Sequence, residues 1–161
     1  MAASTNKKAC IQRFDRETLY GYVSLSTCFQ PKGVELLNLS GSLLLVPYDE
    51  VKAVCLVKEF EAPDPKEKRL FTTRPKSAGL WVRMRFKDGD LLDGLLANNL
   101  VLLDPYGFSV TPPDPSSNIQ RVFVPKGALR ELVVVAVVGS PIKPAARTKP
   151  KPPDRQISLF E

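Results

Sequence analysis

The sequence predicts a mainly β protein made of two tandem small β-barrels followed by a disordered tail. Two observations support this fold class. The body of the chain repeats itself once, and each copy holds short apolar stretches of strand-like pattern separated by tight turn signals. The tail, from residue 139 onward, is rich in proline and lysine and has too few apolar residues to build a core.

Three matches define the repeat. Residues 13–21 align with 85–94, residues 33–36 with 107–110, and residues 45–54 with 123–132. Each copy then closes on an apolar, β-branched stretch, at 54–57 or at 133–138. Five short strands in roughly 55 residues, joined by tight turns, are typical of a small barrel of the SH3-like or Sm-like type. The repeat therefore predicts two such barrels with matching strands and loops of different length.

Local patterns predict the elements within each copy. Gly89 and Gly41 suit hairpin turns, because glycine accepts a positive φ. Residues 80–86 alternate between apolar and polar side chains, which predicts a strand with one face in the core. A short helical or 3₁₀ turn is expected after each Val-Pro pair, at 48–51 and 126–129. The apolar run 132–138 predicts a buried strand.

Composition sets the boundaries between the parts of the chain, because prolines and charges gather in the connections. Residues 69–76, inside the connection between the copies, are expected to lie across one barrel as an extended segment. We expect a flexible N-terminus at 1–6, a first barrel at 7–60, a linker at 61–79, a second barrel at 80–138, a disordered basic, proline-rich linker at 139–155 and a terminal peptide at 156–161.

The body, with its two matched copies, resembles an uncharacterised bacterial family of paired small β-barrel domains. This resemblance supports the fold and implies no activity.

Composition argues against an enzyme. The chain has no histidine, which removes the commonest general acid–base residue and metal ligand. Phosphate-binding loops and dinucleotide fingerprints are also missing from the sequence. Asp88, Asp90 and Asp93 crowd one hairpin, and we interpret them as a solvated turn. We therefore expect no catalytic residues, no cofactor and no metal.

The three cysteines are scattered without metal-ligand spacing. We interpret them as reduced thiols of a cytoplasmic protein, with Cys55 in the core. No apolar run reaches transmembrane length, and the N-terminus lacks the apolar region of a signal peptide, so no membrane partner is expected.

One basic and aromatic surface is a candidate for nucleic-acid binding. Such surfaces bind single-stranded DNA or RNA through phosphate pairing and base stacking. Charges on the outer face of a strand also serve solubility, so this interpretation stays an alternative. The candidate residues are Arg69, Arg74, Lys76, Trp81, Arg83 and Arg85.

The strongest functional signal is the terminal string Gln156, Ile157, Ser158, Leu159 and Phe160. It resembles the bacterial sliding-clamp-binding peptide, Gln-Leu-Ser/Asp-Leu-Phe, with isoleucine in place of the first leucine. The resemblance implies that the Leu and Phe side chains enter an apolar pocket of the clamp, while the Gln side chain hydrogen-bonds at its rim. The alternative is that the peptide folds back onto a barrel as an edge strand or plug.

The expected function is that of a non-enzymatic bacterial accessory or adaptor protein. Its terminal peptide would tether it to the DNA replication sliding clamp, and its barrels would bind DNA or another protein. The alternatives are a nucleic-acid-binding tandem barrel with an incidental tail and a regulatory module that senses a ligand. The sequence implies no particular oligomeric state.

Overall fold

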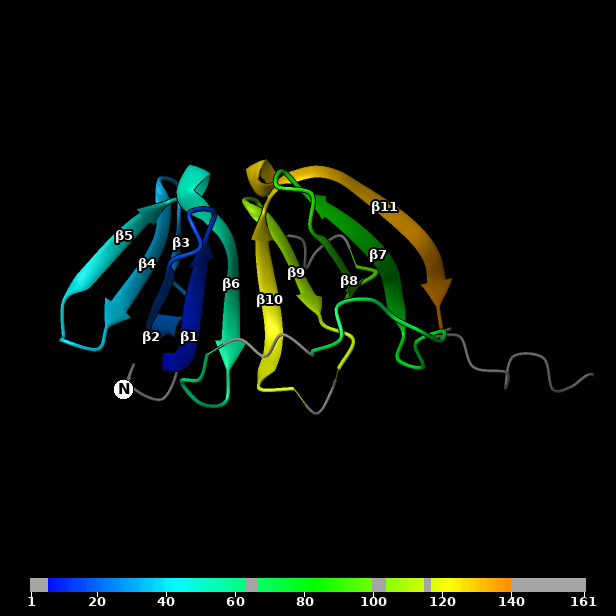
Figure 1. Cartoon of the computed structure of the whole chain (residues 1–161), viewed down its shortest axis with the longest axis horizontal. Helices are drawn as coiled ribbons and strands as arrows, with labels where there is room; N and C mark the ends of the chain where they lie inside the picture. The colour runs from blue at the N-terminus through cyan, green and yellow to red at the C-terminus, as the bar shows by residue number, and fades with distance from the viewer. Residues whose placement is uncertain (1–5, 63–66, 100–103, 115–116, 140–161) are drawn as a thin grey trace, which may run out of the picture.

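The computed structural model describes residues 6–62, 67–99, 104–114 and 117–139, and in these ranges the chain is mainly β, as predicted (Figure 1). Two 3₁₀ turns, η2 (Tyr48–Glu50) and η4 (Lys126–Ala128), follow the two Val-Pro pairs as expected. Within the described ranges, no helix has the length and apolar character needed to cross a membrane. The strands are β1 (Asn6–Arg13), β2 (Thr18–Ser24), β3 (Phe29–Gln30), β4 (Gly33–Asn38), β5 (Leu43–Pro47), β6 (Val51–Val57), β7 (Gly79–Phe86), β8 (Leu91–Leu96), β9 (Gly107–Thr111), β10 (Ile119–Pro125) and β11 (Leu129–Val138).

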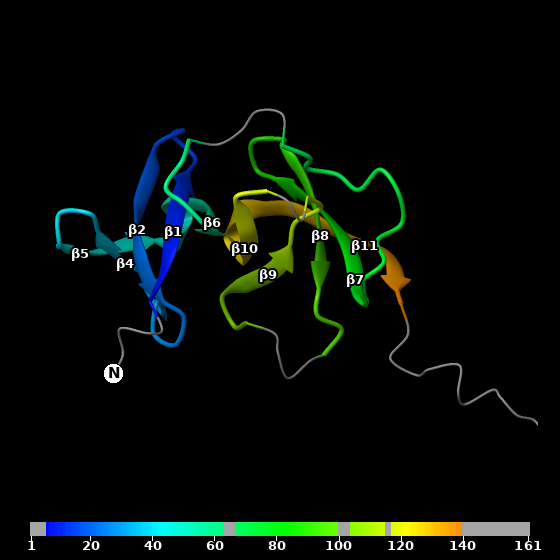
Figure 2. The same ribbon diagram turned by 90° about the horizontal axis from the view of Figure 1, so that it is seen from below.

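The described strands form one antiparallel sheet. Their order is β11-β7-β8-β9-β10-β6-β1-β2-β4-β3, and β5 pairs with the remaining edge of β4. The two halves of the chain follow the same path, since β6-β1-β2-β4-β5 in the first matches β11-β7-β8-β9-β10 in the second. Pairing of β10 with β6 joins them at the centre of the molecule (Figure 2). The sheet thus runs across the boundary between the copies, and two separate tandem barrels are not confirmed.

Equivalent hairpin turns of the two halves are built alike. Gly89 has a φ of +96°, which confirms the predicted tight turn between β7 and β8. Arg16 takes the same place between β1 and β2 with a φ of 75°. Asp88 and Asp15 each accept a hydrogen bond from the backbone N–H two residues later, at 3.1 and 2.9 Å. The first half therefore holds an arginine where the second half has a glycine.

Two hydrophobic cores lie on the two sides of β1 and β6. Successive residues of a strand point to opposite faces, so β6 buries Val54 in the first core and Cys55 in the second. Phe123, on β10 of the second half, belongs to the first core and stacks on Phe29 with ring centroids 4.0 Å apart. Each half therefore contributes side chains to the core of the other.

The prediction of a buried strand at 132–138 is wrong for most of β11. Val133, Val134, Val135 and Val137 are exposed, and Val138 is buried. The physical reason is position in the sheet. In the first half, β6 has neighbours on both edges, whereas β11 pairs with β7 along one edge and with no other described strand. The same apolar pattern is buried in one half and left open in the other.

Candidate functional site

Asp93 on β8 is the centre of a buried polar cluster that contains part of the predicted nucleic-acid surface. Its carboxylate accepts two hydrogen bonds from Arg83, from Nε at 2.7 Å and from Nη2 at 2.9 Å. The indole Nε1 of Trp81 donates to the same carboxylate at 3.0 Å. The strand register produces this arrangement, because Arg83 pairs directly with Asp93 and Trp81 lies two residues away on the same face of β7.

The same cluster fastens the linker to the sheet. The backbone N–H of Phe71 donates to the Asp93 carboxylate at 3.0 Å, and the Asp93 N–H donates to the carbonyl oxygen of Arg69 at 2.7 Å. The Phe71 ring meets the Trp81 ring edge to face, with centroids 5.6 Å apart. These contacts confirm the expected crossing of the linker over one half for residues 69–71.

The Asp93 carboxylate is held in its charged form. Burial alone would raise its pKa, but hydrogen bonds from Arg83, the Phe71 N–H and Trp81 outweigh burial and keep the pKa below its ordinary value. Asp93 in turn raises the pKa of Arg83. Because Arg83 and Asp93 already neutralise and hydrogen-bond each other, Arg83 has little capacity left to bind a phosphate group.

The other predicted basic residues are exposed, and three of them have partners within the chain. Arg74 donates to the carbonyl oxygen of Val137 at 2.8 Å. Arg85 lies 3.8 Å from Glu131, and Arg69 lies 3.9 Å from Asp90. Lys76 is exposed as well. The six residues divide into a hydrogen-bonded cluster and exposed charges, and nucleic-acid binding by them stays a prediction.

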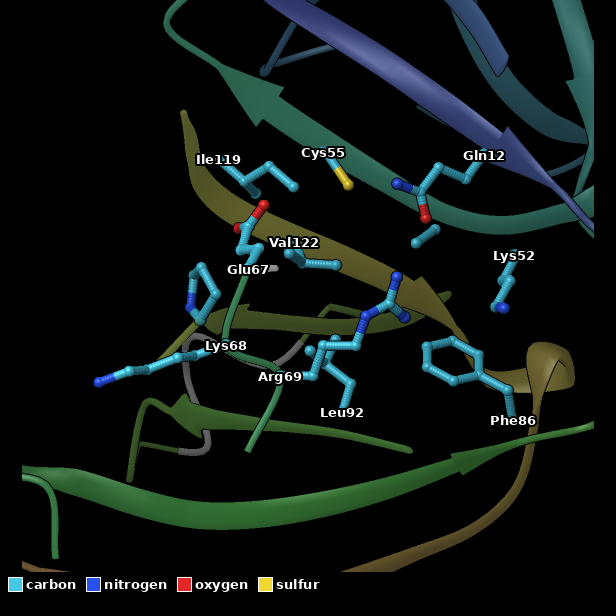
Figure 3. A pocket seen from close by; sticks show the side chains of 12 residues that line it. Gln12, Lys52, Cys55, Glu67, Lys68, Arg69, Phe86, Leu92, Ile119 and Val122 are labelled. Carbon is cyan, nitrogen blue, oxygen red and sulfur yellow. The ribbon is translucent and has the colours of Figure 1, made fainter. Parts of the chain in front are cut away.

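A small cavity lies beneath the linker, between Glu67 and Arg69 on one side and Cys55 of β6 on the other (Figure 3). Its volume is about 50 Å³. Small-molecule sites commonly measure about 300–1,000 Å³, so this cavity suits ordered water better than a metabolite.

A larger hollow of about 300 Å³ lies beside Glu67, whose carboxylate accepts a hydrogen bond from the Ser117 hydroxyl. Its charged lining consists of Glu61, Glu67 and Asp114, with no basic residue among the described residues that line it. An acidic lining repels phosphate groups, so the hollow is a poor fit for a nucleotide.

The three cysteines are free and buried, and Cys55 lies in a core as expected. Cys10 and Cys55 face each other across β1 and β6. A hydrogen bond between their thiols lowers the pKa of Cys10 and, together with burial, raises that of Cys55 well above its ordinary value. Burial raises the pKa of Cys28 to about 11. Over the described residues, no three Cys, Asp or Glu side chains are grouped so that they could hold a metal ion.

Asp93 is the residue that the sequence interpretation placed wrongly. Asp88 and Asp90 are exposed at the turn, as expected, and both pair with Lys52. Asp93 lies inside a strand and is fully buried. The signal that could have found it is the alternation of β8, which puts it on the same face as Trp81 and Arg83 of β7.

The terminal peptide Gln156, Ile157, Ser158, Leu159 and Phe160 lies outside the described residues. Residues 5–136 match the model of a family described as a family of unknown function, DUF6982. The match covers most of the sheet and none of the terminal peptide. No curated protein and no solved structure matches the chain.

Proposed function

The chain belongs to DUF6982, a family of unknown function, and we propose that this member is a non-enzymatic cytoplasmic adaptor of the bacterial replication sliding clamp. The peptide 156–160 binds the clamp, and the sheet is the body that the peptide delivers. In this proposal each half of the sheet acts as a small barrel-like module of the SH3-like or Sm-like type that presents its outer face to DNA or to another protein.

The terminal string Gln-Ile-Ser-Leu-Phe is the observation that carries the proposal. Leu159 and Phe160 are two large apolar side chains at the end of a proline- and lysine-rich stretch that has no core to pack into. Burial of such side chains in a partner's pocket is what makes a short peptide bind. Affinity is then about micromolar, because ordering a flexible segment offsets part of the burial.

The body supports an adaptor role because its most prominent polar groups serve the fold. Asp93, Arg83 and Trp81 hydrogen-bond with one another and with the linker. The cavity beneath the linker is small, and the larger hollow beside Glu67 is acidic. These features favour a rigid scaffold over a catalyst or a nucleotide receptor.

Binding of the full chain to purified bacterial sliding clamp tests the proposal. Isothermal titration calorimetry should give a Kd that rises at least tenfold in Phe160→Ala, which removes the main apolar anchor. The matched control is Ser158→Asp, because the clamp peptide accepts either residue there, and it should bind like the wild type. Both variants should keep the wild-type melting temperature.

Two outcomes would contradict the proposal. Wild-type protein that does not bind the clamp removes the proposed partner. A melting temperature lowered by several degrees in Phe160→Ala would show instead that the peptide packs on the sheet.

The nucleic-acid alternative has its own signature. Binding of a labelled single strand that weakens steeply with salt, and that is lost in Lys76→Glu/Arg85→Glu, would favour it. These two residues are the appropriate pair because both are exposed and neither contacts the Asp93 carboxylate.

A further inference from the structure

The pairing of β10 with β6 joins the two halves and shows how one copy of the repeat attaches to another. Phe123 pairs with Val54, Val122 with Cys55, and Arg121 with Leu56. Val54, Cys55, Val122 and Phe123 are all at most 4% exposed. We call this pairing the internal joint.

Both strands of the internal joint have a counterpart at a free edge of the sheet. In the repeat alignment, residues 45–47 match 123–125, so β5 is the counterpart of β10. Residues 54–57 match 132–135, so β11 is the counterpart of β6. Among the described strands, β5 pairs with β4 alone and β11 with β7 alone. One end of the sheet is therefore β5, the counterpart of β10, and the other end is β11, the counterpart of β6. Each end carries one of the two kinds of strand that pair in the internal joint.

At the free edges, exposed apolar residues occupy several of the positions that the internal joint buries. Leu45 is 48% exposed, whereas its counterpart Phe123 is 4% exposed. Val133 is 45% exposed, whereas its counterpart Cys55 is 2% exposed. Leu43, Val134 and Val135 add to the exposed apolar surface of the two edges.

Protection of these edges is weak where the joint would form. Proteins commonly guard free strand edges with charges, prolines or covering loops. Residues 43–46 and 132–135 contain none of the charged residues or prolines. The contact of the linker with β11, from Arg74 to the carbonyl oxygen of Val137, lies beyond the second of these segments.

We propose that a second copy of this chain is the partner of each free edge, so that β5 of one copy pairs with β11 of the next in the register of the internal joint. Leu45 then lies opposite Leu132, Leu44 opposite Val133, and Leu43 opposite Val134 of the neighbouring copy. The two edges lie at opposite ends of the molecule (Figure 1), so the contact forms between chains. Because two different surfaces meet, the assembly is head to tail and gives a closed ring or an open filament.

The proposal is tested with the full chain by sedimentation velocity and light scattering over a range of concentrations. The wild type should show masses that are multiples of 17.8 kDa and rise with concentration. Leu45→Lys disables β5 and Val133→Lys disables β11, because the counterparts of these residues, Phe123 and Cys55, are buried in the internal joint. Each variant should therefore remain a monomer. Val137→Lys is the matched control, because Val137 is also an exposed valine of β11 but lies outside the joint segment, and it should assemble like the wild type.

Mixing the two disabled variants tests the head-to-tail geometry. A Leu45→Lys chain keeps β11, and a Val133→Lys chain keeps β5, so the mixture should form dimers and nothing larger. Dimer formation also shows that both variants are folded.

Two results would overturn the proposal. One is a wild type that is monomeric up to its highest soluble concentration. The other is a Leu45→Lys chain that assembles normally, which would indicate pairing of β11 with β11. If the wild type is monomeric, assembly once residues 156–161 are deleted would identify the terminal peptide as the occupant of the edge.

Discussion

Asp93 links three segments of the chain that are far apart in the sequence. It contacts Arg83 on β7 and the backbone of Arg69 and Phe71 in the linker, and it lies itself on β8. A buried carboxylate is costly unless every charge and hydrogen bond is matched. The cluster therefore fixes the path of the linker as well as the pairing of two strands.

Replacement of Asp93 should be strongly destabilising. Asp93→Asn keeps the shape of the side chain but leaves the charge of Arg83 without its partner, at a cost of about 2–4 kcal/mol in urea unfolding. Asp90→Asn, at a half-exposed position in the same hairpin, is the control and should cost less than about 1 kcal/mol. Equal effects of the two substitutions would contradict the role assigned to Asp93.

Asp93 should also make the stability of the fold depend on pH. The folded-state pKa of Asp93 lies below its ordinary value of 3.8, so its contribution to stability is complete above about pH 4. The contribution is lost as the pH falls from there through the folded-state pKa, because the unfolded chain takes up the proton first. The acid loss of stability should be smaller in Asp93→Asn than in the wild type, as measured by urea unfolding between neutral and acid pH.

Cys28 should make the stability of the fold depend on pH in the alkaline range. Burial raises its pKa from 9.0 to about 11, so the unfolded chain loses the thiol proton before the folded chain does. The stability that Cys28 contributes is present below pH 9 and falls between pH 9 and pH 11. Cys28→Ala should show a shallower decline over this interval, and an unchanged slope would argue against burial of the thiol.

At the scale of single elements, the two hairpin turns form a natural comparison. Gly89 and Arg16 both adopt a positive φ, 96° and 75°, and such a conformation costs a non-glycine residue about 1 kcal/mol or more. The first half accepts this strain, and the second half avoids it by using glycine.

Exchanging the residue types of these turns should change stability in opposite directions. Gly89→Ala should lower the free energy of unfolding by about 1 kcal/mol. No atom lies within 4 Å of the added methyl group, so the loss is conformational. Arg16→Gly should raise stability by less than about 1 kcal/mol, since relief of strain is partly offset by greater freedom of the unfolded chain. Chemical denaturation measures both changes, and a loss in Arg16→Gly would contradict the strain.

Local elements could be predicted from the sequence because their causes are local. The turn at Gly89, the alternation of β7 and the 3₁₀ turns after Pro47 and Pro125 depend on residues next to each other. The environment of β11 could not be predicted in this way. Its apolar run looks like that of β6, and the difference arises from a neighbour that one strand has and the other lacks.

The position of Asp93 shows the same limit at a polar residue. Its local sequence suggests a hairpin tip, and its burial results from Arg83 on the paired strand and from a linker that returns over it. The alternation along β7 puts Trp81 and Arg83 on one face of the strand, but the carboxylate that accepts their hydrogen bonds could be identified only from the strand pairing.

At the scale of the whole molecule, β1 and β6 lie between the two cores and contribute side chains to both. Because these two strands are buried on both faces, the packing of each half depends on the other half. The continuous sheet could not be predicted from the repeat, since a repeat specifies two similar halves but not the pairing of β10 with β6.

Because β1 and β6 belong to both cores, we expect the chain to unfold as one cooperative unit. Phe123→Ala alters a residue of the second half that lies in the first core, and it should cost about 3–5 kcal/mol. Hydrogen exchange should then accelerate in β4 of the first half as well as in β10. Val137→Ala, at an exposed site, should change stability by less than about 0.5 kcal/mol. Two separate unfolding transitions in the wild type would show that the halves are independent.

Covalent continuity gives the internal joint a property that a contact between chains cannot have. The strands β10 and β6 belong to one polypeptide, so their local concentration is fixed by the chain and does not change on dilution. Pairing of β5 with β11 of another copy obeys mass action and is lost on dilution. The pair of halves is therefore the smallest species that dilution can produce, and any larger assembly exchanges its subunits in steps of one whole chain.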